Sequence, residues 1–186
     1  APPGNYTVEL VVDRDTLVSS FEVLMDPRAE CTREDRISQF EFLKSIRDKV
    51  DETHDAIRHM RSVKSQSSGL LGRLDEDDYP AIFEEARALD SLMTAVEEVL
   101  YQTKLKSNQD MLNFPIKLNN KLAHVGSLAS MGVYAPTEQM VGVRDEVTAL
   151  IDAELAKWHT LRDERLPAFN ALIRDSAIDL IGVPEE

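Results

Sequence analysis

Apolar and polar residues alternate along the N-terminal part of the chain, which is the pattern of a β-strand with one buried face. Residues 6–12 carry apolar side chains at every second position, and a second run follows from Thr16 to Met25. Between the runs lies Asp-Arg-Asp, so we predict a β-hairpin with Arg14 and Asp15 as its turn residues. In this register three pairs share the apolar face: Val12 with Leu17, Val8 with Phe21, and Tyr6 with Val23.

After residue 31 the apolar spacing changes to a period of about 3.6, which is typical of amphipathic helices. Thr32 is a suitable N-cap for a first helix that ends at about Ser65, and a Ser- and Gly-rich turn is expected over residues 65–72. Three further helices are expected: Pro80 to about Lys104, Pro115 to about Ala129, and Pro136-Thr137 to about Ala177, the last kinked or restarted at Pro167.

Connections of this length usually join neighbouring helices, so the predicted fold is mainly α. We expect an antiparallel four-helix bundle over residues 28–186, preceded by the hairpin over residues 1–27. A two-stranded hairpin is marginally stable alone, and its apolar face needs a cover. The preferred interpretation is that the hairpin forms the last two strands of an immunoglobulin-like sandwich. Packing of the hairpin onto the helices is the alternative, and a homodimer through the hairpin is a further expectation.

Charge and composition exclude several classes of partner. The net charge is −13, with 34 acidic residues against 21 basic ones, which argues against a nucleic-acid partner. The sequence contains no apolar run long enough to span a bilayer, so we expect no membrane partner. Cys31 is the only cysteine and cannot form an intrachain disulfide. The first residues, Ala-Pro-Pro-Gly, contain no signal segment, and we expect the chain to be a fragment of a longer protein.

The sequence offers little that resembles a catalytic or metal site. Asp51 and His54 have the spacing at which a carboxylate and an imidazole share a metal in di-iron bundles, but no second such pair occurs. A solvated helix face is the better interpretation. Phosphate loops, serine elbows and Cys/His pairs are also absent from the sequence. We therefore predict no catalytic residue, no metal site and no cofactor.

Amide side chains cluster around the connection between the second and third helices, at residues 108, 109, 113, 119 and 120. They either bind a sugar or peptide, or act as a structural clamp for the backbone of the connection. We favour the clamp, because Pro115 has no N–H to offer the carbonyl groups at the end of the preceding helix. Asn119 or Asn120 is expected to bond the loop backbone, with Phe114 buried near Trp158 or Leu155. The clamp candidates are Asn113, Phe114, Pro115, Asn119, Asn120 and Trp158.

Four segments carry a resemblance to a known family: MDPR at residues 25–28, YQTKLKSNQDMLNFPIKLNNKLAHV at 101–125, APTEQM at 135–140 and LPAFNALI at 166–173. Together they resemble the C-terminal region of large secreted bacterial proteins of the sortilin-like, Asp-box (BNR) repeat glycosyl hydrolase type. The resemblance implies a β-propeller and an immunoglobulin-like domain upstream as partners in the same protein, and an extracellular or periplasmic location. The Asp-box motif itself is absent, so no catalytic residue is carried over.

Three functions are compatible with these observations. The leading hypothesis is a non-catalytic C-terminal helical module with a structural, interdomain or protein-interaction role in a secreted propeller protein. The alternative is an accessory region that contributes to a carbohydrate-binding or glycoside hydrolase site of the parent protein. A third is an adaptor that binds another protein in a groove between helices, which predicts an exposed apolar patch.

Overall fold

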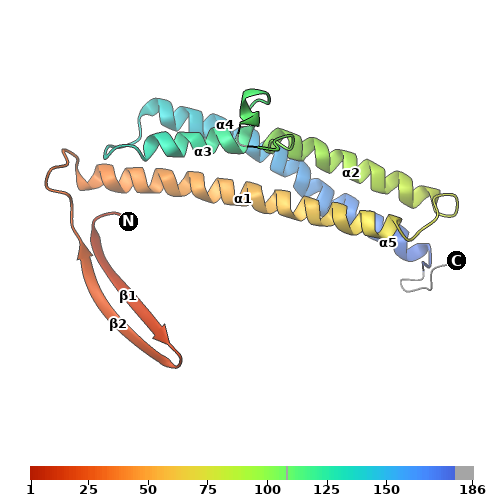
Figure 1. The fold of residues 1–186 in the computed structure, drawn as a ribbon, viewed down its shortest axis with the longest axis horizontal. Coiled ribbons are helices and arrows are strands. Elements are labelled where there is room, and N and C mark those ends of the chain that lie inside the picture. Colours follow the sequence, from red (N-terminus) through yellow and green to blue (C-terminus); the bar gives the residue numbers. More distant parts are fainter. Residues whose placement is uncertain (108, 179–186) are drawn as a thin grey trace. The chain divides into compact units, whose positions relative to one another are not determined.

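The computed structural model describes residues 1–107 and 109–178 and shows a mainly helical chain with an N-terminal antiparallel hairpin (Figure 1). This confirms the mainly α prediction and the hairpin. The elements in chain order are β1 (Gly4–Val12), β2 (Asp15–Val23), α1 (Arg33–Leu71), α2 (Pro80–Leu100), the 3-10 turn η1 (Asp110–Leu112), α3 (Leu118–Ala129), α4 (Glu138–Thr160), the π-helical turn η2 (Leu161–Arg165) and α5 (Leu166–Asp175).

The hairpin has a different register from the predicted one. Tyr6 pairs with Phe21 and Leu10 with Leu17, so the two turn residues are Asp13 and Arg14 rather than Arg14 and Asp15. Asp13 has a φ of 54°, a left-handed conformation that Asp tolerates better than most residues. The predicted pairing was therefore wrong by two residues. Because strand side chains alternate with a period of two, this shift leaves the predicted apolar residues on one face.

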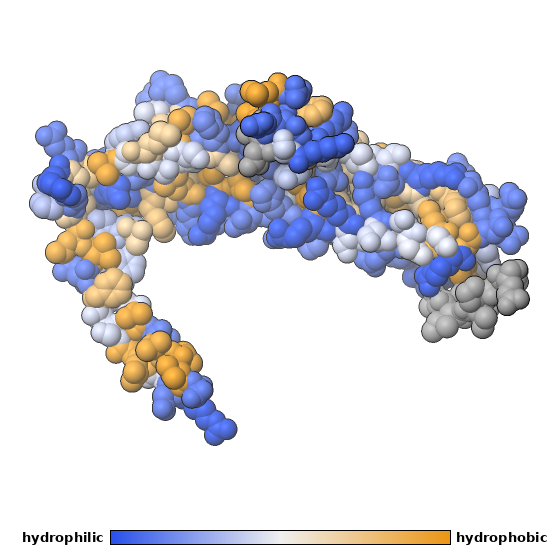
Figure 2. Space-filling view, viewed as in Figure 1, coloured by the Kyte–Doolittle hydropathy of each residue, from blue (hydrophilic) through white to orange (hydrophobic). Residues whose placement is uncertain are grey.

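That apolar face is open to solvent. Val8, Leu10 and Phe21 are 51%, 56% and 50% exposed, and Figure 2 shows apolar side chains gathered along the hairpin. Tyr6 stacks on Phe21 with ring centroids 5.9 Å apart, and its hydroxyl donates to the carbonyl of Pro2 over 2.6 Å. The alternative, in which the hairpin packs onto the helices of this chain, stays a prediction.

Capping explains where α1 begins, and packing explains where it ends. The N–H of Asp35 donates to Oγ1 of Thr32 over 3.0 Å, and the N–H of Thr32 donates back to the Asp35 carboxylate over 2.9 Å. This reciprocal pair confirms Thr32 as the N-cap. The helix continues six residues beyond the predicted Ser65, to Leu71. Leu70 and Ser67 line a hollow shared with α5, so tertiary contacts extend the helix through its Ser- and Gly-rich end.

Proline marks the starts of α2 and α4 as predicted, whereas α3 begins at Leu118 rather than Pro115 and α2 ends at Leu100 rather than at about Lys104. Pro80 opens α2, and Thr137 caps α4 by accepting from the N–H of Met140 over 3.2 Å. Pro167 does not break the last helix. Instead the turn before it widens into η2, in which the N–H of Leu166 bonds the carbonyl of Leu161. A π-helical turn of this kind lets a helix continue past a residue that lacks an N–H.

By its internal contacts the chain divides into two compact units. Unit 1 comprises Ala1–Val50 and Leu122–Glu146, and unit 2 comprises Asp51–Lys121 together with the described residues from Val147 onward. This division differs from the predicted boundary at residue 27, because α1, α3 and α4 each contribute to both units. The assignment of residues 1–27 and 28–186 to separate domains stays a prediction.

In unit 1 the N-terminal half of α1 packs against α3 and α4. Gly126 brings α3 close to α1, because a Cβ at this position would lie 3.2 Å from Cγ2 of Ile46. The buried Gln39 side chain donates to the carbonyls of Ala129 and Gly132 over 2.6 and 2.7 Å, which satisfies the end of α3. On the α4 side the guanidinium of Arg144 lies 4.9 Å from the ring centre of Phe42.

In unit 2 the C-terminal half of α1 packs against α2, and α5 packs against both. The core consists mainly of aliphatic side chains and Met, with Trp158 and Phe169 as its buried aromatic residues. Arg165 of η2 forms a forked ion pair with Glu85 of α2, with the shortest contact at 2.6 Å. The core residues of this unit are Ala56, Ile57, Met60, Ile82, Ala86, Leu89, Met93, Val96, Leu100, Leu118, Val147, Ile151, Leu155, Trp158, Leu161 and Phe169.

The close approach at Gly126 gives a direct test of packing in unit 1. We expect Gly126→Leu to lower the free energy of unfolding by about 1–3 kcal/mol, because the new side chain must displace Ile46. Gly142 in α4 is the matched control, since nothing lies within 4 Å of its added Cβ. Gly142→Leu should not lower stability, because it replaces a helical glycine in open space. Urea unfolding of both variants measures the difference, and equal losses would contradict the packing described for α3.

Candidate functional site

One buried amide holds the connection between α2 and α3 together. α2 ends where Tyr101 turns to an extended conformation, with φ −135° and ψ 143°. The next residue, Gln102, is only 6% exposed. Its Nε2 donates to the carbonyl of Pro115 over 2.8 Å, and its Oε1 accepts from the N–H of Lys104 over 3.2 Å. The Gln102 side chain thus ties the first residues of the connection to its last ones.

A second polar contact organises the middle of the connection. The carboxylate of Asp110, in η1, accepts from the N–H groups of Lys106 and Ser107 over 2.6 and 3.0 Å, and from the Ser107 hydroxyl over 3.2 Å. These hydrogen bonds favour the ionised form, so the pKa of Asp110 is lowered, mainly by the N–H of Lys106 and then by that of Ser107. The connection is therefore an ordered turn stabilised by a carboxylate.

The structure places Asn119 elsewhere than expected. Asn119 is 5% exposed, and its Nδ2 lies 3.2 Å from Nε2 of His54 on α1. Its Oδ1 is buried without a hydrogen-bond partner among the described residues. Turning the amide over would pair Oδ1 with His54 and leave Nδ2 unpaired instead. Asn120 is half-buried in α3, and its side chain makes no hydrogen bond with the described part of the chain. The loop backbone is held by Gln102, not by these two asparagines.

The other predicted clamp residues lie in or near the connection. The N–H groups of Asn113 and Phe114 both donate to the carbonyl of Asp110, over 2.9 and 3.0 Å. Phe114 is half-buried and lines a hollow of about 130 Å³ with Pro115. Trp158 is buried in the core of unit 2. The expected contact of Phe114 with Trp158 or Leu155 stays a prediction.

Gln102 is the residue that the sequence analysis missed. A glutamine has one more methylene than an asparagine, so its amide can span the width of a loop. The available signal was its position two residues after Leu100, the last apolar residue of the α2 stripe. An amide placed directly after a helix can reach carbonyl groups that the following segment leaves unpaired.

A buried carboxylate connects α1 to α2 close to the same region. Glu97 is buried, and its Oε1 accepts from Nε of Arg61 over 2.7 Å. Nζ of Lys64 donates to the Thr94 hydroxyl and lies 4.0 Å from Glu97. The Arg61 guanidinium also lies 5.3 Å from the ring centre of Tyr101. Because the buried carboxylate is matched by cations on α1, the cluster holds the two helices in register rather than presenting a free base.

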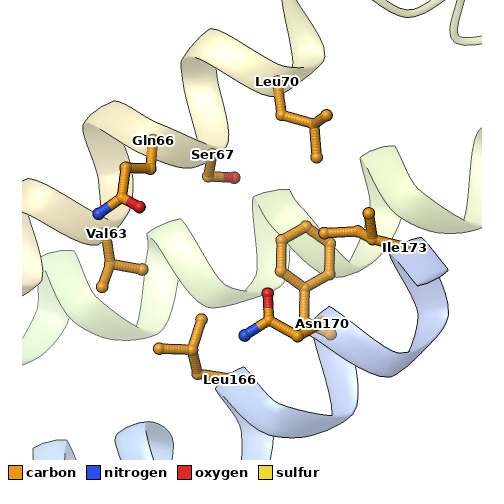
Figure 3. Close-up of a pocket in the computed structure, with 8 residues that line it drawn as sticks. Val63, Gln66, Ser67, Leu70, Leu166, Asn170 and Ile173 are labelled. Atoms are coloured by element: carbon orange, nitrogen blue, oxygen red, sulfur yellow. The ribbon is translucent and has the colours of Figure 1, made fainter. Parts of the chain in front are cut away.

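A separate hollow of about 210 Å³ lies between α1 and α5 (Figure 3). Its walls are mostly aliphatic, and its polar groups are the side chains of Gln66, Ser67 and Asn170. Among the residues that the structure describes, no titratable side chain lines it, so these residues supply no acid, base or activated nucleophile there. They are Val63, Gln66, Ser67, Leu70, Leu166, Phe169, Asn170 and Ile173.

The residues considered for metal binding are not gathered into a site. Asp51 is exposed, and His54 faces Asn119. Within residues 1–107 and 109–178 no three His, Cys, Asp or Glu side chains come together as a metal-binding group. No helix in the described part of the chain combines the length and apolarity needed to cross a membrane. Comparison with family models, curated proteins and solved structures gives no match.

The contrast between Gln102 and Asn119 can be measured. We expect Gln102→Ala to lower the free energy of unfolding by about 1–3 kcal/mol, since it removes a buried side chain that makes two hydrogen bonds. Asn119→Leu should change the free energy of unfolding by less than about 1 kcal/mol. It loses the contact with His54, but it also removes a buried oxygen that has no hydrogen-bond partner among the described residues. Thermal or urea unfolding of both variants provides the test. A larger loss for Asn119→Leu than for Gln102→Ala would show that Asn119 is the stronger contributor.

The Asp110 turn has a predictable pH dependence. Because its folded-state pKa is lowered, the contribution of the turn is fully present above the ordinary Asp value of 3.8 and is lost as the pH falls through the lowered pKa. In an NMR titration the amide signals of Lys106 and Ser107 should therefore shift with a midpoint below 3.8. The Asp110→Asn variant is the control and should lack this transition. A midpoint above 3.8 would contradict the described hydrogen bonds.

Proposed function

We propose that this chain is a non-catalytic helical module with a structural and protein-interaction role, and that its hairpin docks into a β-sheet. The single observation that carries the proposal is the exposed apolar face of β1 and β2. Both strands are nine residues long, and they pair in continuous register without a bulge or a proline. Long, flat apolar strands with free edges are usually covered by another sheet or chain.

The size of the hairpin favours a cover within the same polypeptide over a second copy of this chain. Nine residues at about 3.4 Å each give a length of about 30 Å, and two strands present a face about 10 Å wide. The face is thus about 300 Å², so two hairpins packed face to face would bury about 600 Å² in total. Stable interfaces bury at least about 1,200 Å². A homodimer through the hairpins alone falls short of this size.

The preferred cover is therefore the remainder of an immunoglobulin-like sandwich, to which β1 and β2 would contribute the last two strands. This agrees with the resemblance to the C-terminal region of secreted sortilin-like, Asp-box repeat proteins, in which such a domain precedes the helical tail. On this proposal the upstream sandwich and propeller are partners within the same protein, and the location is extracellular or periplasmic. The antiparallel four-helix bundle stays a prediction for the helices.

The test compares this chain with a longer polypeptide that also includes the preceding residues of the parent protein. Hydrogen exchange of the β1 and β2 amides should be fast in this chain and slower by about a hundredfold or more in the longer polypeptide, because local openings of a covered sheet cost several kcal/mol. Phe21→Lys should destabilise the longer polypeptide by about 2–4 kcal/mol, since it places a charge on the covered face.

Ser20→Lys is the matched control, because Ser20 lies on the opposite face of β2. It should change stability by less than about 1 kcal/mol. Equal hydrogen exchange in the two polypeptides would refute the docking proposal. A dimer of this chain in sedimentation analysis, converted to monomer by Phe21→Lys, would show that a second copy covers the hairpin instead.

A further inference from the structure

Positive charge is concentrated in one short part of an acidic protein. Residues 102–121 contain four lysines and one acid, so this part of the sequence has a net charge of +3, whereas the whole chain has −13. The lysines are Lys104, Lys106, Lys117 and Lys121. Such segregation creates a local field opposite to that of the rest of the surface.

These four lysines have no ion-pair partner among the described residues. Basic side chains elsewhere are commonly paired: Lys44 with Asp48 at 2.9 Å, and Arg87 with Glu76 at 2.5 Å. Although the sequence has 34 acidic residues, lysines without an ion-pair partner leave a local excess of positive charge in this part of the chain. An opposite charge supplied by another molecule would compensate it.

The Gln102 hydrogen bonds bring two of these lysines together. By joining Lys104 to Pro115, Gln102 places Lys104 beside Lys117 at one hollow of about 130 Å³. Thr103, Glu98 and the half-buried ring of Phe114 complete its lining. The hollow is therefore lined by two lysines, a threonine, one glutamate and an aromatic residue within a small volume.

Exposed apolar side chains accompany the lysines. Leu112, in η1, is 91% exposed, and Ile116, between two residues that line the hollow, is 44% exposed. The Asp110 hydrogen bonds fix the turn that carries Leu112. An ordered turn that presents a leucine to solvent in the same connection as lysines without ion pairs has the composition of a docking surface: an apolar contact with a charged rim.

We infer that the surface formed by Lys104, Lys106, Leu112, Ile116 and Lys117 binds an acidic segment of a partner protein. An Asp or Glu side chain of that segment enters the hollow between Lys104 and Lys117, and a neighbouring apolar side chain contacts Leu112 or Ile116. We call this surface the lysine surface. The inference rests on the proposed protein-interaction role, and it adds a second partner, an acidic polypeptide, to the sheet proposed to cover the hairpin.

A polypeptide fits the lysine surface better than other polyanions. Glu98 in the hollow opposes the entry of any anion, and a peptide can offset this repulsion because its backbone N–H groups can donate hydrogen bonds to the Glu98 carboxylate. A phosphate backbone or an anionic bilayer is a large surface of uniform sign, and the remaining negative charge of the chain opposes contact with either. A short acidic segment is small enough to contact only the lysine surface and so avoids the negative charge on the rest of the chain.

The test is selection from a random peptide library displayed on phage, carried out with the full chain. We expect the enriched peptides to carry Asp or Glu next to Leu, Ile or Phe. The variant with Lys104→Glu and Lys117→Glu should bind the best selected peptide at least about tenfold more weakly, because each change replaces an attraction with a repulsion. Leu112→Ser should weaken it by about threefold or more.

The matched control carries Arg28→Glu and Lys44→Glu, which change the net charge equally at exposed positions outside the lysine surface. Its affinity for the peptide should lie within about twofold of that of the chain without substitutions. Circular dichroism melting verifies that every variant is folded. Selection of peptides without acidic residues, or equal weakening by the two double variants, would overturn the inference.

A vesicle experiment distinguishes the lipid alternative. If no acidic peptide is enriched, and phosphatidylserine vesicles bind the parent chain but not the Lys104→Glu and Lys117→Glu variant, the partner is a membrane surface and the inference is wrong. The hairpin variant Phe21→Lys should bind the selected peptide as tightly as the chain without substitutions. A result that refutes hairpin docking therefore differs from one that refutes peptide binding at the lysine surface.

Discussion

α1 buries apolar side chains from Phe42 to Met60, and the need to cover them constrains how the following helices are arranged. α1 has 39 residues and is about 58 Å long, whereas α2 has 21 residues and α3 has 12. The contacts of Arg61 with Glu97 place α2 along the C-terminal half of α1. The contact of Ile46 with Gly126 places α3 along the N-terminal half. α2 and α3 thus each cover a different part of α1. The chain must therefore leave helical structure after α2 and enter it again at α3.

That interruption explains why polar side chains hold the backbone in place at residues 101–117. A helix that stops in mid-structure leaves carbonyl groups without partners, and the chain that follows must be positioned before α3 begins. Gln102 and Asp110 meet the second need: Gln102 donates to the carbonyl of Pro115, and the Asp110 carboxylate accepts from the N–H of Lys106. The same bonds hold Lys104 near Lys117 and fix the turn of Leu112. The hydrogen bonds of Gln102 and Asp110 therefore both order the connection and position its exposed side chains.

The sequence predicted the existence and type of most elements better than their contacts. Thr32 and Pro80 gave correct helix starts because capping and proline geometry are local. The hairpin register failed by two residues because alternation defines faces, not pairing, and the conformation of Asp13 decided between two possible turns. Asn119 was assigned the loop contact that Gln102 makes, because composition showed many amides and could not show which one reaches Pro115. Long-range contacts depend on helix phase and side-chain reach, which a single sequence does not specify.

The π-helical turn before Pro167 also determines the rotational phase of everything that follows it. Leu161 and Phe169 are both buried, although they are eight residues apart. Eight residues of regular α-helix would rotate the second side chain about 80° past the first, whereas one widened turn absorbs the surplus residue and returns it to the same stripe. Each residue of a helix corresponds to about 100° of rotation. η2 therefore absorbs one surplus residue: loss of a single residue there would leave a regular α-helix in which Phe169, seven residues after Leu161, stays within about 20° of the same stripe.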